Sequence, residues 1–211
     1  MNETEVPMNQ HLNLRFKGAR EYLQGPDIYN ALFEWVIANG ANPPISDVDL
    51  SIHRIVSRQL DVVDASTVNS AARPAATCSF TERGARRHLA LIETEQPVTE
   101  RYPYDEDSIV RQMVIDAPAR SGKLSTNPGF SPIEIWVAMT KAVHIGVFGP
   151  SIKWLFVRAR LEAHIPTFES GDWTTTIAAS FRDKLTRNEI AHDGKKVGDI
   201  FFAPKGKHAG H

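Results

Sequence analysis

Two long apolar segments with helical spacing dominate the pattern of hydrophobic and polar positions along the chain. Each begins at a proline and reaches a glycine fourteen residues later, Pro26 to Gly40 in the first and Pro132 to Gly146 in the second. Proline in the first turn and glycine just beyond the last turn are typical of helix boundaries. The two segments lie about half a chain length apart, so the sequence predicts two copies of one structural unit.

Stretches in which apolar and polar residues alternate flank both predicted helices, and this alternation is typical of half-buried strands. We expect strands at 12–17, 48–52 with a continuation through 60–63, 76–81, 86–93, 108–115, 155–161, 173–182, 185–191 and 197–202. Turn residues at 82–84 and 192–194 predict hairpins in matching places of the two halves. Residues 65–75 and 117–131 are predicted to be loops.

The two predicted helices differ in how their apolar residues are distributed. The first has one apolar stripe, formed by Ile28, Leu32, Trp35 and Val36, and a separate polar face with Asp27, Asn30 and Glu34. The second is apolar nearly all round, with Ile133, Ile135, Trp136, Val137, Met139, Val143 and Ile145. A helix of the second kind is typically buried, so we expect it at the centre of its half.

A strand, a long helix and three or four antiparallel strands, present twice, resemble the hotdog fold, in which a curled sheet wraps one central helix and two such units join their sheets. The segment 153–202, with its KWLFVRARL strand and HDGKKVGDIFF hairpin, is similar to hotdog enzymes that act on acyl thioesters. The resemblance implies an α+β double hotdog of two β-α-β-β-β units, each with a long central helix packed on a joined antiparallel sheet. An ordinary α+β domain with a coincidental repeat is the alternative.

The repeat also predicts how the chain is divided. We expect a disordered lead at 1–11, a first hotdog-like half at 12–100, a second at 101–204 and a frayed tail at 205–211. No low-complexity linker separates the halves, so one fused domain is expected rather than two independent ones. The choice between a monomer and a homodimer stays open, because exposed sheet edges favour further pairing.

Composition and charge narrow the classes of function. A net charge of −1 argues against a dedicated nucleic-acid-binding protein, which needs a basic surplus. The single cysteine excludes an intramolecular disulfide framework and a cysteine-based zinc cluster, and we expect no metal or other cofactor. The start is polar and acidic, unlike a secretory signal, and the most apolar stretch, 133–149, is too short and too charged to cross a bilayer. We therefore expect a soluble cytoplasmic protein without a membrane partner.

Asp27, Glu134 and His144 are the candidate catalytic residues. The resemblance implies that a carboxylate near the start of a central helix acts as general acid or base on an acyl thioester, and Asp27 and Glu134 have that place. The alternatives are a solvated helix face for Asp27 and a capping box for Glu134 with Ser131. His144 either points outward beside Lys141 at the helix end or faces the cleft between the halves and transfers protons.

The loop before the first helix supplies two candidate substrate-binding residues, Tyr22 and Gln24. Dehydratases of the hotdog superfamily carry a histidine in this place. Neither this loop nor the one before the second helix contains a histidine. The sequence therefore argues against the ordinary histidine-based dehydratase mechanism.

Four further side chains are candidates for contact with an acyl thioester. We expect the acyl chain to lie along the second helix, near Trp136 and Met139. Arg158 and Arg160 either form a solvated strand face or bind the phosphates of coenzyme A or of a carrier-protein arm, since guanidinium groups suit phosphate.

These observations predict a protein that binds an acyl thioester, with acyl-CoA or acyl carrier protein as partner. As an enzyme of fatty acid metabolism it would be a thioesterase or a 3-hydroxyacyl dehydratase/hydratase. Backbone N–H groups at a helix start would polarise the thioester carbonyl. The alternative is a non-catalytic hotdog protein that binds a ligand or serves as a structural subunit, and the missing loop histidine favours it.

Overall fold

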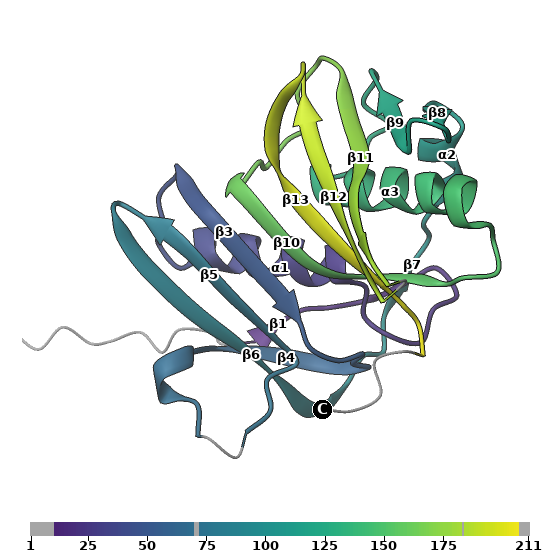
Figure 1. Ribbon diagram of the computed structural model, residues 1–211. Coiled ribbons are helices and arrows are strands. Elements are labelled where there is room, and N and C mark those ends of the chain that lie inside the picture. Colours follow the sequence, from purple (N-terminus) through teal and green to yellow (C-terminus); the bar gives the residue numbers. More distant parts are fainter. Residues whose placement is uncertain (1–10, 70–71, 183, 207–211) are drawn as a thin grey trace, which may run out of the picture.

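The computed structural model describes residues 11–69, 72–182 and 184–206. The helices are α1 (Gly25–Ala38), α2 (Glu106–Val110) and α3 (Pro132–Phe148), with a 3₁₀ turn, η1 (Ala65–Thr67). The strands, labelled in Figure 1, are β1 (His11–Leu12), β2 (Phe16–Lys17), β3 (Ile45–Ile52), β4 (Arg58–Asp64), β5 (Ala76–Glu82), β6 (Ala85–Pro97), β7 (Arg101–Tyr102), β8 (Val114–Asp116), β9 (Ser121–Leu124), β10 (Trp154–Ala163), β11 (Trp173–Phe181), β12 (Leu185–His192) and β13 (Lys195–Pro204).

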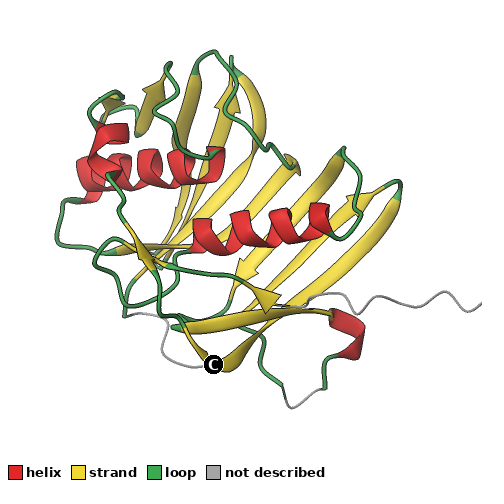
Figure 2. Cartoon of the chain, turned by 180° about the vertical axis from the view of Figure 1, so that it is seen from behind, coloured by secondary structure: helices red, strands yellow, loops and turns green. Residues whose placement is uncertain are grey.

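One curved sheet of eleven strands organises the fold, in the order β1-β4-β6-β5-β3-β10-β13-β12-β11-β9-β8. A separate two-stranded sheet pairs β2 with β7 in parallel. Figure 2 shows α1 and α3 on the same face of the large sheet, each crossing the strands of one half. The hairpins β5-β6 and β12-β13 form at the predicted turns. Each turn contains two residues with positive φ, Arg83 and Gly84 in the first and Asp193 and Gly194 in the second.

The two halves of the sheet meet at β3 and β10. These strands pair antiparallel from Ser46 opposite Ala163 to Ser51 opposite Arg158. The strands formed by residues 11–97 lie on the β3 side of this seam, apart from β2, and those formed by residues 114–204 lie on the β10 side. Because β10 starts at Trp154, its first residues extend beyond its pairing with β3, and the two strands part at this end.

Both long helices begin where the sequence predicted. Pro26 and Pro132 lie in the first turns of α1 and α3. Gly25 lets α1 begin against the sheet, because a Cβ at this position would lie 2.3 Å from Phe156 Cδ1 and 2.7 Å from Ile52 Cδ1. α3 buries eleven of its seventeen residues, as expected of a helix that is apolar nearly all round.

The strand predicted at 108–115 is wrong over its first part, which belongs to α2. The Asp105 side chain accepts a hydrogen bond from the backbone N–H of Ser108, and Glu106 and Asp107 occupy the first turn, where acidic groups favour a helix. Ile109 anchors α2 in the core. The alternating pattern at these positions reflects a single buried residue on a short helix.

Two other expectations need correction. The stretch 12–17 is not one strand, because β1 pairs with β4 while β2 pairs with β7. The predicted loop 117–131 contains β9, which pairs with β11. Gly122, in the middle of β9, packs against Met113 and Val143. Because glycine has no side chain, the sequence of β9 lacks the apolar residue that would indicate a buried strand position. Residues 1–10 of the expected lead and 207–211 of the expected tail lie outside the described residues.

Candidate functional site

A cavity of about 1460 Å³ opens where β3 and β10 part. Its walls come from both halves: the start of α1 and the end of β3 on one side, and α2, α3 and β10 on the other. The apolar side chains that line it include Leu23, Ile52, Ile55, Val110, Ile115, Val137, Ile145, Ile152, Leu155, Phe156, Val157, Leu185 and Phe201. A cavity of this size and lining suits an elongated, largely apolar ligand.

Exposed apolar side chains gather at the mouth of this cavity. Ile55, Ile115 and Ile145 all line it, and each is exposed although isoleucine is usually buried. Exposed apolar side chains that cluster at an opening are typical of a binding site rather than of ordinary surface.

The cavity is also more basic than the chain as a whole. Six basic side chains and two acidic ones line it, whereas the net charge of the chain is −1. Among the basic ones, Arg158 is neutralised by Asp49, to which it donates hydrogen bonds of 2.8 and 2.5 Å, and Arg54 pairs with Glu93. Lys153 and Lys205 form no ion pair with any described residue.

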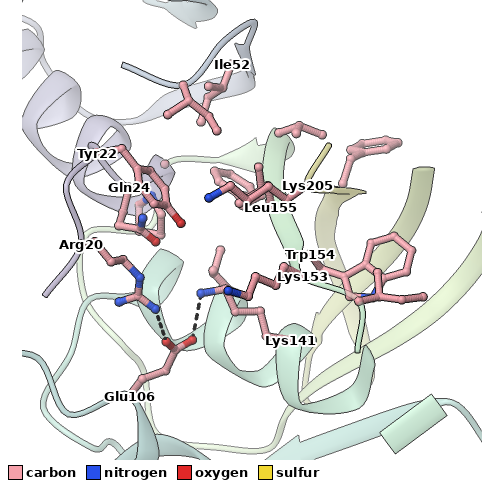
Figure 3. Close-up of a pocket in the computed structure, with 18 of the residues that line it drawn as sticks. Arg20, Tyr22, Gln24, Ile52, Glu106, Lys141, Lys153, Trp154, Leu155 and Lys205 are labelled. Carbon is pink, nitrogen blue, oxygen red and sulfur yellow. Dashed lines mark hydrogen bonds and ion pairs between the residues drawn. The ribbon is translucent and has the colours of Figure 1, made fainter. Parts of the chain in front are cut away.

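Lys153 and Lys205 are held next to each other by the backbone. The N–H of Lys205 donates to the carbonyl oxygen of Lys153 at 2.7 Å, and the Lys205 ammonium lies 5.4 Å from the centroid of the Tyr22 ring. Figure 3 shows Lys205 extending toward Tyr22 and Gln24 across the cavity. Both lysines are exposed, so they mark the mouth of the cavity as an anion-attracting surface.

A second charged group lies on the cavity wall. Glu106 of α2 accepts hydrogen bonds of 3.0 Å from Arg20 Nη2 and from Lys141 Nζ, one at each carboxylate oxygen (Figure 3). Burial alone would raise the pKa of Glu106, but the charges of Lys141 and Arg20 outweigh it and hold the pKa below its usual value. The group is therefore ionised and carries a net charge of +1.

The two predicted helix-start carboxylates meet at a buried lysine. Lys17 Nζ lies 2.9 Å from Asp27 Oδ1 and 2.6 Å from Glu134 Oε1, and its side chain is only 3% exposed. Tyr102 donates a further hydrogen bond of 2.8 Å to Asp27, and the Tyr104 ring centroid lies 4.1 Å from the ammonium. This cluster ties β2 to the starts of α1 and α3.

The two carboxylates of this cluster differ in their pKa. For Asp27, burial raises the pKa and outweighs the attraction of Lys17. For Glu134, burial acts in the same direction, but Lys17 and the hydrogen bonds from Ser131 outweigh it and lower the pKa. The Ser131 N–H donates to Glu134 at 3.0 Å, as the capping-box pattern predicted. Asp27 and Glu134 do not line the cavity.

His144 lies in the core of the second half. Its Nε2 is 2.8 Å from the Thr186 hydroxyl, and its ring stacks on Trp154 with centroids 4.6 Å apart. Burial lowers the pKa of His144 to about 4, so the ring is neutral near pH 7. It is not among the residues that line the cavity, and it does not point outward beside Lys141.

The remaining predicted substrate-binding residues divide between cavity and core. Tyr22, Gln24 and Arg158 line the cavity. Trp136 and Met139 are each 1% exposed and do not line it; Trp136 packs on Trp173 with ring centroids 5.4 Å apart. Arg160 is an exposed residue whose guanidinium lies 3.3 Å from Asp49.

Sequence reasoning missed Lys17, Lys153 and Glu106, which carry part of the charge of the two sites. Lys17 alternates with apolar neighbours in the way that a solvent-facing strand residue does, and yet it is buried. Glu106 lies in a stretch predicted to lead into a strand, and Lys153 carries no motif. No three His, Cys, Asp or Glu side chains of the described residues are grouped to hold a metal ion. In the described part of the chain, no helix has the length and apolarity to span a bilayer.

The buried state of His144 predicts a pH dependence of stability. Its folded pKa of about 4 lies below the usual value of 6.5, so the unfolded chain binds more protons between these values. The free energy of unfolding should fall as pH decreases from 6.5 to 4, with His144 contributing at most about 1.4 kcal/mol per pH unit. Urea denaturation at several pH values should show a shallower decline for His144→Gln; parallel profiles for the two proteins would contradict the assignment.

Solved structures with a similar fold include a dehydratase domain, a tesB protein and a dehydratase-cyclase domain. The dehydratase domain of PpsC from Mycobacterium tuberculosis, solved with C12:1-CoA, has a TM-score of 0.46 and 11% identity over 87% of this chain and 85% of that chain. The tesB protein of Mycobacterium avium subs paratuberculosis has a TM-score of 0.45 and 12% identity over 87% of each chain. A bifunctional dehydratase-cyclase domain in ambruticin biosynthesis has a TM-score of 0.42 and 11% identity over 87% of this chain and 81% of that chain. No protein-family model and no curated protein sequence matches the chain.

The architecture of the chain agrees with the hotdog fold. This architecture, a large antiparallel sheet that curves around long helices on one face, is the arrangement that the sequence resemblance predicted (Figure 2). The resemblance to hotdog proteins is therefore confirmed at the level of the fold. Only about a tenth of the residues are identical to those of the similar structures. The ligand of the cavity therefore depends on the side chains of this chain.

Proposed function

We propose that this protein is a double hotdog that binds an acyl thioester of coenzyme A or of an acyl carrier protein in the cavity between its halves. The observation that carries the proposal is the combination of a large apolar cavity with two lysines at its mouth, Lys153 and Lys205, that form no ion pair with a described residue. The acyl group and the pantetheine arm are largely apolar and flexible, whereas the carrier end bears phosphate. Lysine ammonium groups suit phosphate, and the apolar walls suit the acyl chain.

The start of α1 is the place for the thioester carbonyl. The helix dipole favours a partial negative charge there. Pro26 has no N–H, and the N–H groups of Asp27 and Ile28 donate to the Gln24 carbonyl oxygen, so the N–H of Gly25 is the donor that we assign to the ligand. Gln24 and Gly25 both line the cavity at this point. A carbonyl oxygen bound here would be polarised, as both hydrolysis and hydration chemistry of an acyl thioester require.

If the protein is a thioesterase or a dehydratase/hydratase, we assign proton transfer to Glu106 and Lys141, which are ionisable and line the cavity. We assign Asp27 and Glu134 to holding the two helix starts through Lys17, and His144 to the packing of the second half. This assignment differs from the expectation that the resemblance implied.

Binding without turnover is a second candidate function. It is favoured by the state of Glu106, because a carboxylate held between two cations, with its pKa below the usual value, is a weak general base. In this case the protein would hold or deliver an acyl thioester and leave the thioester bond intact.

A thermal-shift and turnover experiment tests both candidates. Acyl-CoAs of graded chain length and an acylated carrier protein should stabilise the folded state, by about 2.7 kcal/mol at a hundred times the dissociation constant. Release of free thiol from an acyl-CoA, or conversion of a 2-enoyl-CoA and water to the 3-hydroxyacyl-CoA, would establish the enzyme, and stabilisation without either reaction would establish the binding protein. The absence of stabilisation by CoA, by all acyl-CoAs and by the acylated carrier protein would overturn the proposal.

A further inference from the structure

The ion pairs of Glu106 with Arg20 and Lys141 on the cavity wall affect which acyl chains the cavity can bind. Resting on the proposed function, we infer that the acyl group bound in this cavity carries a carboxylate of its own, recognised by Arg20 and Lys141. A plain saturated chain needs only apolar walls. Arg20, Glu106 and Lys141 instead place three charges among the apolar residues that line the cavity.

The hydrogen-bonding capacity of the two cations exceeds what Glu106 uses. Arg20 donates one side-chain hydrogen bond to Glu106, and Lys141 donates another, within the part of the chain that the structure describes. A guanidinium has five N–H donors and an ammonium has three. The other donors have no side-chain partner among the described residues, so they are available to acceptor oxygens of a ligand.

The charge balance of the group favours an anion over a neutral oxygen. Two cations and one carboxylate leave a net charge of +1, and the side chains of Arg20, Glu106 and Lys141 are only 31%, 22% and 23% exposed. In such a partly buried place, water screens the excess charge poorly. A second carboxylate would complete an alternating array of two cations and two anions, with charge-assisted hydrogen bonds to both cations.

This cationic group is separate from the lysines at the mouth. Lys153 and Lys205 are exposed, whereas Arg20 and Lys141 are partly buried against Glu106. In Figure 3, Arg20 and Lys141 converge on Glu106, whereas Lys205 extends toward Tyr22. The exposed lysines suit the phosphates of the carrier, and the inner pair suits the carboxylate of the acyl group.

Matched ligands test the inference. The dissociation constants of succinyl-, adipoyl- and suberyl-CoA would be measured by calorimetry against those of butyryl-, hexanoyl- and octanoyl-CoA, so that each pair has the same number of carbons. At the chain length that reaches Arg20 and Lys141, the carboxylated member should bind at least about tenfold more tightly, as a charge-assisted contact provides.

Substitutions of opposite expected effect sharpen the test. Lys141→Met and, on the more accessible loop, Arg20→Gln should each reduce the preference for the carboxylated member. Glu106→Gln should increase it, because this change removes the internal carboxylate that occupies both cations. Lys123→Met is the matched control, since Lys123 pairs with Asp172 outside the cavity, and it should leave the preference unchanged.

The outcomes separate this inference from the proposed function. If both members of every pair bind equally well, the acyl-thioester function stands and the carboxylate inference is overturned. The same conclusion follows if the carboxylated member is preferred but Lys141→Met and Arg20→Gln both fold and keep the full preference. If none of the CoA thioesters or their carrier-protein counterparts binds, the proposed function fails and the inference fails with it.

Discussion

Replacing Lys17 by methionine should lower the free energy of unfolding by about 3–5 kcal/mol, the usual loss when one partner of a buried ion group is removed. Without the ammonium, Asp27 and Glu134 would face each other's charge near two helix starts, with no cation beside them. Methionine retains most of the apolar part of the lysine side chain, so the decrease in the free energy of unfolding comes from the lost charge and not from an empty space in the core. Urea denaturation at pH 7, monitored by tryptophan fluorescence, measures it.

The pH and a surface lysine provide the controls for this substitution. The deficit of Lys17→Met should shrink as pH falls, because protonation removes the charges that the lysine had compensated. Lys123→Met breaks an ion pair whose side chains are 50% and 45% exposed, and it should change the free energy of unfolding by about 0–1 kcal/mol. A loss for Lys17→Met as small as that of this control would contradict a structural role for the cluster.

Reversing both charges at the mouth of the cavity should weaken the binding of CoA thioesters by roughly a hundredfold or more. The double variant Lys153→Glu/Lys205→Glu replaces two attractive contacts to phosphate with two repulsive ones, and each charge-assisted contact contributes about 1.5–3 kcal/mol. Both side chains are exposed, so the fold should tolerate the change. Calorimetric titration with an acyl-CoA, in parallel with a thermal melt of the free protein, measures the two effects separately.

A matched double variant distinguishes contact from net charge. Lys123→Glu/Lys195→Glu changes the charge of the protein by the same amount at exposed positions away from the cavity. It should weaken binding only slightly, and the difference should shrink at high salt because exposed charges are screened. If both double variants weaken binding equally, Lys153 and Lys205 do not contact the ligand.

Local sequence patterns were informative wherever one element decides the outcome. Pro26 and Pro132 marked the two helix starts correctly, and the turns at 82–84 and 192–194 marked two hairpins. The errors fell on short elements. α2 is five residues long and β9 is four, so neither contains enough alternation to reveal its type.

The candidate site could be predicted only in part. Tyr22 and Gln24 line the cavity because the start of α1 borders it, and their role in substrate binding stays a prediction. Trp136, Met139 and His144 were expected near a ligand, yet α3 turns them into the core, and its face with Lys141 and Ile145 borders the cavity instead. Helical periodicity shows which residues share a face, but a helix that is apolar nearly all round gives no sign of which face meets the ligand.

By itself, then, the sequence determined the two long helices and most of the strands, because backbone preferences and hydrophobic periodicity act between residues close along the chain. Only the tertiary structure decided that Lys17 joins Asp27 to Glu134, and that Arg20, Glu106 and Lys141 meet on one cavity wall. These charges come from segments far apart in the sequence. The strength of an ion pair depends on the distance between the charges and on their burial in the folded chain, and the local pattern of residues predicts neither quantity.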